Sequence, residues 1–177
     1  GSIHGICQDM LYGGDGLTMS ELTEALAGSP AAGNNLSMLG FDACLMGSAE
    51  VASLMAPYAE YMVASEESEP GFGWDYSFLR DLELDADGCA TGKRIAESYL
   101  TALNQKYGEY PGTATLSVIQ LKKIGTMVEA LDALFAELQV TPEAYAVYAG
   151  VRARTRSFGE SDKANKDYDL VDLNDLV

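Results

Sequence analysis

The segment LSMLGFDA, residues 36–43, is the feature of this sequence that most constrains the fold. It is short, mostly apolar and bounded by turn signals, a pattern typical of a strand buried in the centre of a sheet. Two further apolar runs, residues 62–65 and 113–121, predict other strands. Helical periodicity occurs before, between and after these strands, over residues 17–28, 46–59, 91–108, 121–139 and 141–159. This alternation predicts an α/β fold with a mostly parallel sheet flanked by helices.

Side chains with strong positional preferences predict where several helices begin. Ser48 is placed to cap the helix after residue 44, and Pro57 to help end it. Thr91 is the expected N-cap of the helix over residues 91–108, and Pro142 occupies a first-turn position in the predicted helix over residues 141–159.

Length and charge narrow the class of protein. A chain of 177 residues with 47% hydrophobic content is predicted to form a single domain over residues 1–177. Because Gly1-Ser2 does not look like a natural start and the apolar end has no capping signal, we expect this domain to be cut at both ends. The 27 acidic against 11 basic residues, a net charge of −16, argue against nucleic-acid binding and against anionic membrane surfaces, and no apolar run is long enough to span a bilayer.

The cysteines exclude some chemistries. Cys7, Cys44 and Cys89 form no CxxC pair, and with one histidine the sequence offers no zinc site, so no metal is predicted from these residues. Cys44 follows a predicted strand and precedes a helix, where backbone N–H groups and the helix dipole favour a thiolate. A small core residue is the more ordinary role for a cysteine there, so position alone favours the core role.

Four segments decide between these roles because they resemble one family. They are GDGLTMSELTEAL at residues 14–26, GFDACLMGSAEVA at 40–52, SEESEPGFGWDY at 65–76 and YDLVDLNDL at 168–176. All four resemble the clostripain-like cysteine peptidases, which belong to the same clan as caspases, legumains and gingipains. The resemblance covers nearly the whole chain and implies a caspase-like three-layer sandwich.

The resemblance also implies residue roles. Cys44 would be the nucleophile that attacks a peptide carbonyl and forms a thioester. Asp42 matches the acid that selects Arg or Lys at the cleavage site, and alternate residues of a strand would place it on the same face as Cys44. The other interpretation of Asp42 is a turn or capping carboxylate.

Further acidic residues could add negative charge around that pocket. Asp75 is one candidate, and Glu66, Glu67 and Glu69 are others, although a charge run in a loop is more often solvated surface. Trp74 could form a wall of the pocket, but a core anchor is the favoured interpretation.

The general base is the open question. His4 and Gly5 have the order that the family uses, with a histidine as base and the glycine N–H joining the Cys44 N–H in the oxyanion hole. The register of the resemblance instead places the family histidine before Gly1, which would make His4 an ordinary loop residue and would require another segment or chain to complete the site. Because no Lys or Arg precedes Arg80, cleavage after a basic residue between His4 and Cys44 cannot occur.

The predicted function is therefore a cysteine endopeptidase acting after Arg or Lys. Two other functions remain open: a catalytically inactive peptidase fold used for binding or adhesion, and another acyl hydrolase or acyltransferase with a cysteine nucleophile. The expected partners are peptides or proteins with Arg or Lys at the cleavage site, and a second chain of the same precursor. The resemblance implies a secreted or cell-envelope protein, and it adds calcium dependence, although no EF-hand-like loop occurs in the sequence.

Overall fold

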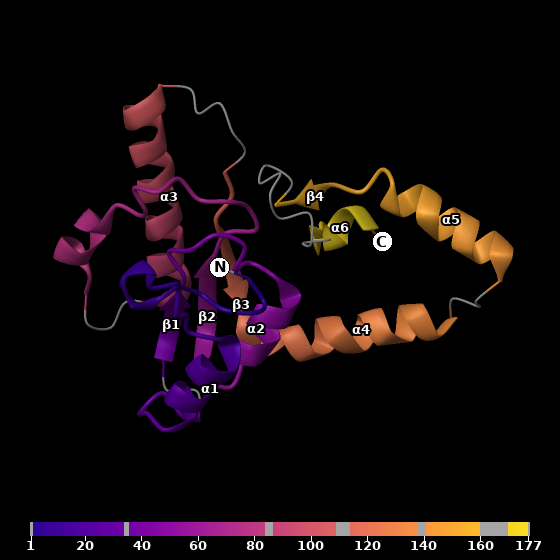
Figure 1. The fold of residues 1–177 in the computed structure, drawn as a ribbon, viewed down its shortest axis with the longest axis horizontal. Helices are drawn as coiled ribbons and strands as arrows, with labels where there is room; N and C mark the ends of the chain where they lie inside the picture. Colours follow the sequence, from indigo (N-terminus) through magenta and orange to yellow (C-terminus); the bar gives the residue numbers. More distant parts are fainter. Residues whose placement is uncertain are drawn as a thin grey trace. The chain divides into compact units, whose positions relative to one another are not determined.

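The structure is a computed structural model that describes residues 2–33, 36–83, 87–108, 114–137, 141–159 and 170–176 (Figure 1). Contacts divide the chain into two compact units, Gly1–Lys122 and Lys123–Val177. All residues predicted to carry chemistry lie in the first unit.

The first unit is built on a three-stranded sheet with the order β1-β2-β3. Strand β1 (Leu36–Gly40) pairs in parallel with β2 (Ala59–Ala64), whereas β3 (Ser117–Gln120) pairs with β2 in the antiparallel direction. The α/β class is thus confirmed, but the sheet is small and mixed, and the expectation of a mostly parallel sheet is wrong for β3.

The direction of β3 follows from where the preceding helix begins. Helix α3 (Gly88–Tyr107) starts beside the first residues of β1, because a Cβ atom on Gly88 would lie 2.2 Å from the Ser37 carbonyl oxygen. The chain between β2 and α3 has therefore already crossed back along the sheet. Helix α3 then returns it to the opposite end, where Ser117 pairs with Ala64.

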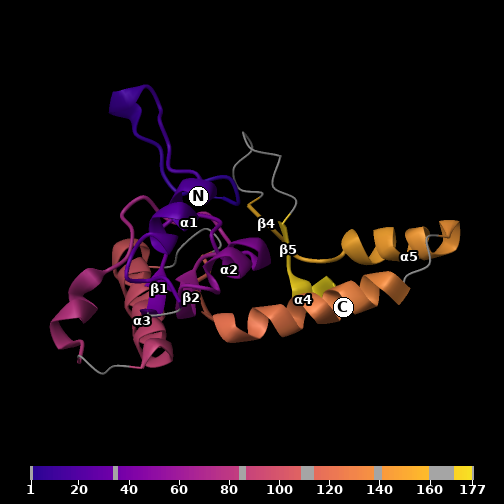
Figure 2. The same ribbon diagram turned by 90° about the horizontal axis from the view of Figure 1, so that it is seen from below.

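Helix α3 covers one face of this sheet and makes the main core contacts with it. Gly92 permits the close approach, since a Cβ atom there would lie 2.9 Å from methyl groups of both Val63 and Val118. Figure 2 shows the strands between α3 on one side and α1 (Met19–Ala27) and α2 (Ala49–Met55) on the other. The core cluster on the α3 side consists of Val63, Trp74, Phe78, Ile95, Tyr99 and Leu103.

Helix caps confirm some sequence predictions and correct one. Ser48 caps α2 by accepting a hydrogen bond from the Val51 N–H, as predicted. Thr18 and Glu21 form a capping box at the start of α1. The prediction for Thr91 is wrong: Asp87 caps α3, because its carboxylate reaches the Cys89 N–H, and Thr91 is buried in the first turn.

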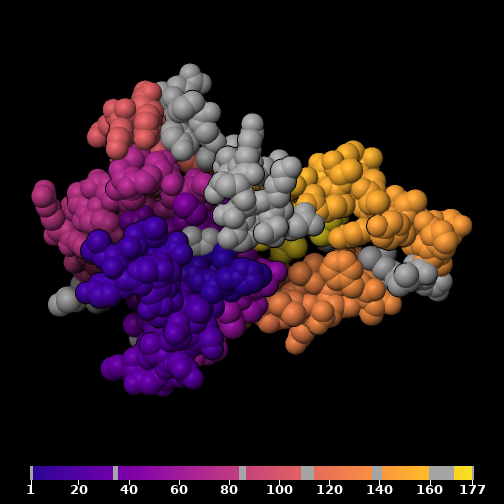
Figure 3. All heavy atoms as spheres, in the orientation of Figure 1, coloured from indigo at the N-terminus to yellow at the C-terminus, as the bar shows by residue number. Residues whose placement is uncertain are grey.

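The N-terminal segment forms a loop that is held by short backbone bridges. Ser2 pairs with Gly5, and Asp9 pairs with Asp15 across the short 3-10 helix η1 (Met10–Tyr12). Figure 3 shows these residues, in indigo, on the outside of the first unit.

The second unit begins at Lys123, the last residue of a short 3-10 helix, η3 (Leu121–Lys123). It contains α4 (Ile124–Glu137) and α5 (Pro142–Arg152), and Pro142 occupies the first turn of α5 after the Thr141 cap, as predicted. Strands β4 (Ser157–Phe158) and β5 (Leu170–Val171) pair in the antiparallel direction, and α6 (Leu173–Leu176) follows them. Within the described residues, no helix has the length and apolar character that a membrane crossing requires.

Candidate active site

Cys44 lies in the loop between β1 and α2, at the carboxyl end of β1. The strand ends at Gly40 and the helix begins at Ala49, so the predicted placement of Cys44 after the central strand is confirmed. Its side chain is half-buried, and none of the three cysteines forms a disulfide. Helix α2 begins five residues after Cys44 and is only seven residues long. The polar groups that reach the sulfur belong to Glu69, which follows β2.

The backbone immediately after Cys44 is strained and clamped. Leu45 adopts a left-handed φ of 60°, which costs a non-glycine residue about 1–2 kcal/mol. Its N–H donates to the Glu67 carbonyl oxygen at 3.2 Å, and the Gly47 N–H donates to the Ser65 carbonyl oxygen at 2.7 Å. A Cβ atom on Gly47 would lie 2.8 Å from the Ser65 carbonyl carbon, so glycine is needed for this approach. The Cys44 loop is thus fixed against residues 65–69, which follow β2 and are called the support segment below.

A buried pair of hydroxyl groups holds the support segment in turn. The Ser65 side chain is fully buried, and its hydroxyl lies 3.1 Å from that of Thr115 and donates to the Glu67 carbonyl oxygen at 3.0 Å. The Thr115 hydroxyl oxygen accepts from the N–H groups of Glu66 and Glu67 at 3.0 and 3.2 Å. The residues leading into β3 therefore help to position the loop that carries Cys44.

The last residue of the support segment contacts the Cys44 sulfur directly. The Glu69 N–H donates to Sγ at 3.2 Å, and the Glu69 carbonyl oxygen lies 3.8 Å from Sγ, within reach of the thiol hydrogen. An N–H group at this distance stabilises negative charge on the sulfur, and the carbonyl group orients the thiol. Among the described residues, the Cys44 backbone N–H has no hydrogen-bond partner, which leaves it available to an incoming oxygen atom.

Asp42 is oriented by the segment that follows the support segment. Its Oδ2 atom accepts from the Trp74 N–H at 3.1 Å and from the Tyr76 hydroxyl at 2.8 Å. Gly73 makes this possible, because it has a left-handed φ of 69° and a Cβ atom there would lie 2.8 Å from the same oxygen. Since β1 ends at Gly40, the expected strand alternation of Asp42 and Cys44 is wrong. Contacts with residues 69–76 bring the two side chains into one region instead.

The side chain of Glu69 is the most perturbed ionisable group of this region. Both carboxyl oxygens are buried and have no hydrogen-bond partner among the described residues. Burial above all, and the adjacent Asp42 carboxylate as well, raise the pKa of Glu69 to about 8, while the Trp74 side chain acts in the opposite direction. Burial and Asp42 also raise the pKa of Tyr76 to about 12, so its hydroxyl remains a donor to Asp42.

The expectation that the acidic loop is solvated surface is therefore wrong in part. Glu67 is only 5% exposed, and one carboxyl oxygen of Glu66 is buried along with both of Glu69. The core interpretation of Trp74 is confirmed. Its side chain is 8% exposed and its ring packs on Gly40, where a Cβ atom would lie 3.0 Å from the ring.

Among the described residues, no hydrogen bond joins His4 to Cys44. The His4 backbone N–H donates to the Ser2 hydroxyl oxygen at 3.0 Å, and its carbonyl accepts from the Met19 N–H at 3.3 Å. The imidazole is exposed, and within the part of the chain that the structure describes it makes no hydrogen bond. The Gly5 N–H, the expected second oxyanion donor, instead donates to the Ser2 carbonyl oxygen at 3.3 Å.

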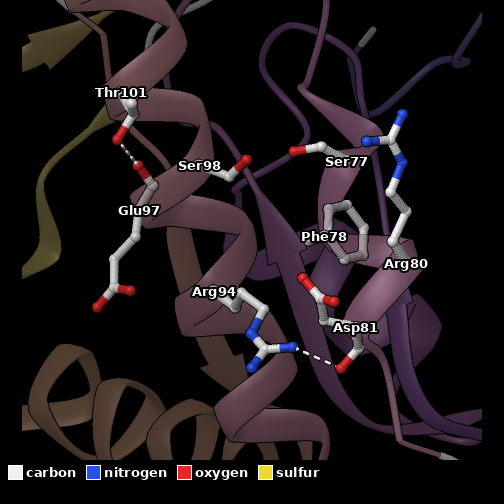
Figure 4. A pocket seen from close by; sticks show the side chains of 8 residues that line it. All are labelled: Ser77, Phe78, Arg80, Asp81, Arg94, Glu97, Ser98 and Thr101. Atoms are coloured by element: carbon white, nitrogen blue, oxygen red, sulfur yellow. Dashed lines mark hydrogen bonds between the residues drawn. The ribbon is translucent and has the colours of Figure 1, made fainter.

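Asp75 faces a different part of the unit. Its carboxylate caps the 3-10 helix η2 (Tyr76–Asp81) through the Ser77 N–H and hydroxyl, and it accepts from the Ser98 hydroxyl at 3.3 Å. The Ser77 hydrogen bonds lower the pKa of Asp75. Ser77 and Ser98 line a polar groove of about 410 Å³ between η2 and α3, whose lining includes neither Asp42 nor Cys44 (Figure 4). The described residues contain no cluster of three potential metal ligands.

Comparison with known proteins assigns this chain to a family. The profile of the clostripain family, peptidase family C11, matches residues 1–177. The chain belongs to the clostripain family. Its resemblance to the clostripain-like cysteine peptidases, stated from the sequence, is thereby confirmed. No curated protein matches the chain.

Several solved structures resemble this clostripain-family chain. A B. fragilis cysteine protease is 25% identical with a TM-score of 0.55, over 68% of this chain and 49% of that one. A secreted C11 cysteine protease from Bacteroides thetaiotaomicron, in complex with an irreversible peptide inhibitor, is 25% identical with a TM-score of 0.57, over 70% and 36%. An inactive zymogen C11 protease from Parabacteroides distasonis is 19% identical with a TM-score of 0.65, over 99% and 46%. The chain thus spans less than half of each of these structures.

The clostripain-family site contains residues that the sequence did not single out. The left-handed Leu45 has no sequence signal, since leucine rarely adopts this conformation. The contact of Ser65 with Thr115 joins residues 50 positions apart and could not be inferred from local pattern. Tyr76 and Gly73 did have a signal, because they belong to the quoted FGWDY segment, but their contacts with Asp42 required the fold.

The raised pKa of Glu69 predicts a specific pH dependence of stability. Its pKa is about 8 in the folded protein against an ordinary value of 4.5, so between these pH values the folded state binds more protons than the unfolded state. Stability from the neutral side chain is complete below about pH 4.5 and is lost as the pH rises toward 8. Glu69→Gln should therefore gain stability relative to the wild type as the pH rises from 5 to 8, measured by urea unfolding. A difference that stays constant over this range would contradict the shift.

Proposed function

We propose that this chain forms part of the catalytic domain of a cysteine endopeptidase that cleaves peptides after Arg or Lys, on a caspase-like three-layer arrangement. The observation that carries the proposal is the pairing of Cys44 and Asp42 within one clamped loop. Glu69 contacts the Cys44 sulfur, while Trp74 and Tyr76 orient the Asp42 carboxylate. A nucleophile and a cation-binding group thus share one rigid support.

Cys44 is the nucleophile in this proposal. Its thiolate attacks the carbonyl carbon of the peptide bond, and the Cys44 N–H donates to the oxygen atom that becomes negatively charged. The carbon–nitrogen bond then breaks, the leaving amine takes a proton from a histidine, and a thioester remains on Sγ. Water hydrolyses the thioester and restores the thiol. The strained φ of Leu45 and its hydrogen bond to Glu67 support this role, because they fix the backbone next to the nucleophile.

Asp42 selects the basic side chain. It is exposed to incoming ligands, and its two donors leave the second carboxylate oxygen free of hydrogen bonds among the described residues. A guanidinium or ammonium group can bind that oxygen through a charge-assisted hydrogen bond. The net charge of −16 favours the approach of cationic peptides.

The base is proposed to be a histidine other than His4. The exposed imidazole of His4 makes no hydrogen bond with any described residue, and Gly5 uses its N–H within the N-terminal loop. The register of the family resemblance agrees, since it places the histidine outside residues 1–177. We further propose that the protein is exported and that its partners are peptides, as the names of the secreted relatives support.

The Asp42 role predicts a change in cleavage preference. Asp42→Asn keeps an oxygen acceptor for Trp74 and Tyr76 but removes the charge, so the loop should stay folded. In the full-length protein, kcat/KM should fall about 10- to 150-fold for peptides with Arg at the cleavage site, the loss expected for one charged hydrogen bond. Peptides with Leu there should change little. Cys44→Ala serves as the blank and should abolish turnover of both.

Asp75→Asn is the matched control for Asp42→Asn. It removes a nearby carboxylate that caps η2 and accepts a hydrogen bond from Ser98, and asparagine is also a good cap. Its preference for Arg should equal that of the wild type. Unchanged preference in Asp42→Asn, or full turnover in Cys44→Ala, would overturn the assignments.

Because His4 is not the proposed base, its substitution should leave activity nearly unchanged. His4→Ala in the full-length protein should retain activity within about threefold of the wild type, because the removed imidazole is exposed and makes no hydrogen bond with any described residue. Loss of a general base lowers rates by about 10²–10⁴-fold. A kcat/KM reduced to that extent, with the fold intact by circular dichroism, would identify His4 as the base.

A further inference from the structure

The proposed mechanism assigns no role to the Glu69 side chain. Its backbone holds the Cys44 sulfur, yet its carboxyl group occupies a buried position beside Asp42 and makes no hydrogen bond among the described residues. Burying a carboxyl group without partners costs free energy, so a merely structural role would be better served by an apolar side chain. The site keeps an acid there instead.

A second polar group at this position also lacks a partner. Trp74 is only 8% exposed, its indole nitrogen is buried, and its N–H makes no hydrogen bond among the described residues. It lies close enough to the Glu69 carboxyl group to affect it. An unpaired donor next to an unpaired acid is an arrangement that can stabilise a negative charge on that acid once the charge forms.

Asp42 and Glu69 differ in the support that they receive. Asp42 accepts two hydrogen bonds, from the Trp74 backbone and from the Tyr76 hydroxyl, which stabilise its charged form. Glu69 receives neither, and a second negative charge beside Asp42 is unfavourable. In the free protein Glu69 therefore keeps its proton at neutral pH beside Asp42.

We propose that Glu69 is a second specificity-determining acid of the peptidase site, neutral in the free protein and ionised when a substrate's Arg or Lys side chain binds at Asp42. The inference rests on the proposed function. The incoming cation removes the repulsion between the two carboxylates, Glu69 releases its proton to solvent, and the basic side chain then meets two negative charges. Direct contact with Glu69 is not required, because a charge within about 4–6 Å already changes the ionisation of a carboxyl group.

Other ionisable groups also face Glu69. Asp42 comes from the β1–α2 loop and Tyr76 from the start of η2, and the pKa of Tyr76 is raised to about 12 by burial and Asp42. Cys44, on the same loop as Asp42, contacts the Glu69 backbone. A test must therefore separate Glu69 from the thiol and from the catalytic histidine.

Paired ligands achieve this separation. In the full-length protein carrying Cys44→Ala, binding is measured between pH 5 and 9 for two peptides that differ only in arginine or citrulline, its neutral analogue, at the cleavage site. Titration of the histidine affects both peptides alike and cancels in the ratio of their affinities. A cation at this distance lowers a carboxyl pKa by about 1–3 units, so the ratio should rise about 10- to 1,000-fold over this range, mainly below pH 8.

Glu69→Gln, added to the same background, should still prefer arginine but with a ratio that no longer changes with pH. Glutamine has the shape of the neutral acid, so the fold should be retained. Glu50→Gln, which removes an exposed carboxylate from α2, is the control for net charge and should keep the full pH dependence.

The outcomes separate this inference from the proposed function. A preference for arginine that is independent of pH in the protein with Glu69 would overturn the role of Glu69 and leave the Asp42 assignment standing. A pH-dependent ratio that survives Glu69→Gln would overturn it as well. Equal binding of the arginine and citrulline peptides at every pH would contradict the basic specificity itself.

Discussion

The backbone clamp between the Cys44 loop and the support segment is the interaction on which the rest of the site depends. Leu45 is held in a left-handed conformation by the Glu67 carbonyl group, and Gly47 is held by Ser65. The same segment ends at Glu69, which contacts the sulfur. Because Ser65 and Thr115 fix that segment to the sheet, the position of the thiol is set by the parallel pair β1–β2 and by the residues that lead into β3.

The same short stretch of chain, residues 69–76, serves both the nucleophile and the carboxylate that we assign to specificity. Glu69 contacts Cys44, while Trp74 and Tyr76 orient Asp42. Gly73 permits the tight approach between the two segments. A side chain bound at Asp42 is therefore coupled through a few rigid contacts to the sulfur, which is what an enzyme needs to place a peptide bond near its nucleophile.

The sequence predicted those parts of the fold and site that depend on local pattern. Strand β1, helix α2 with its Ser48 cap, and Pro142 in α5 follow from hydrophobic period and capping preference. The direction of β3 did not, because it depends on where α3 starts. The FDACLMGS segment indicated Cys44 and Asp42. The burial of Glu69 arises from contacts between distant segments, and the hydrogen bond of the Gly5 N–H to Ser2 required the structure. Contacts between distant segments cannot be predicted from local sequence pattern.

The surroundings of Cys44, rather than its exposure, distinguish it as the proposed nucleophile. Cys7 is the exposed cysteine, whereas Cys44 and Cys89 are half-buried. The most direct measurement treats the full-length protein with an irreversible peptide ketone ending in Arg, and locates the adduct by mass spectrometry. We expect modification of Cys44 alone at one equivalent, and none when the Arg is replaced by citrulline. Modification of Cys7 or Cys89, or equal labelling by the citrulline compound, would contradict it.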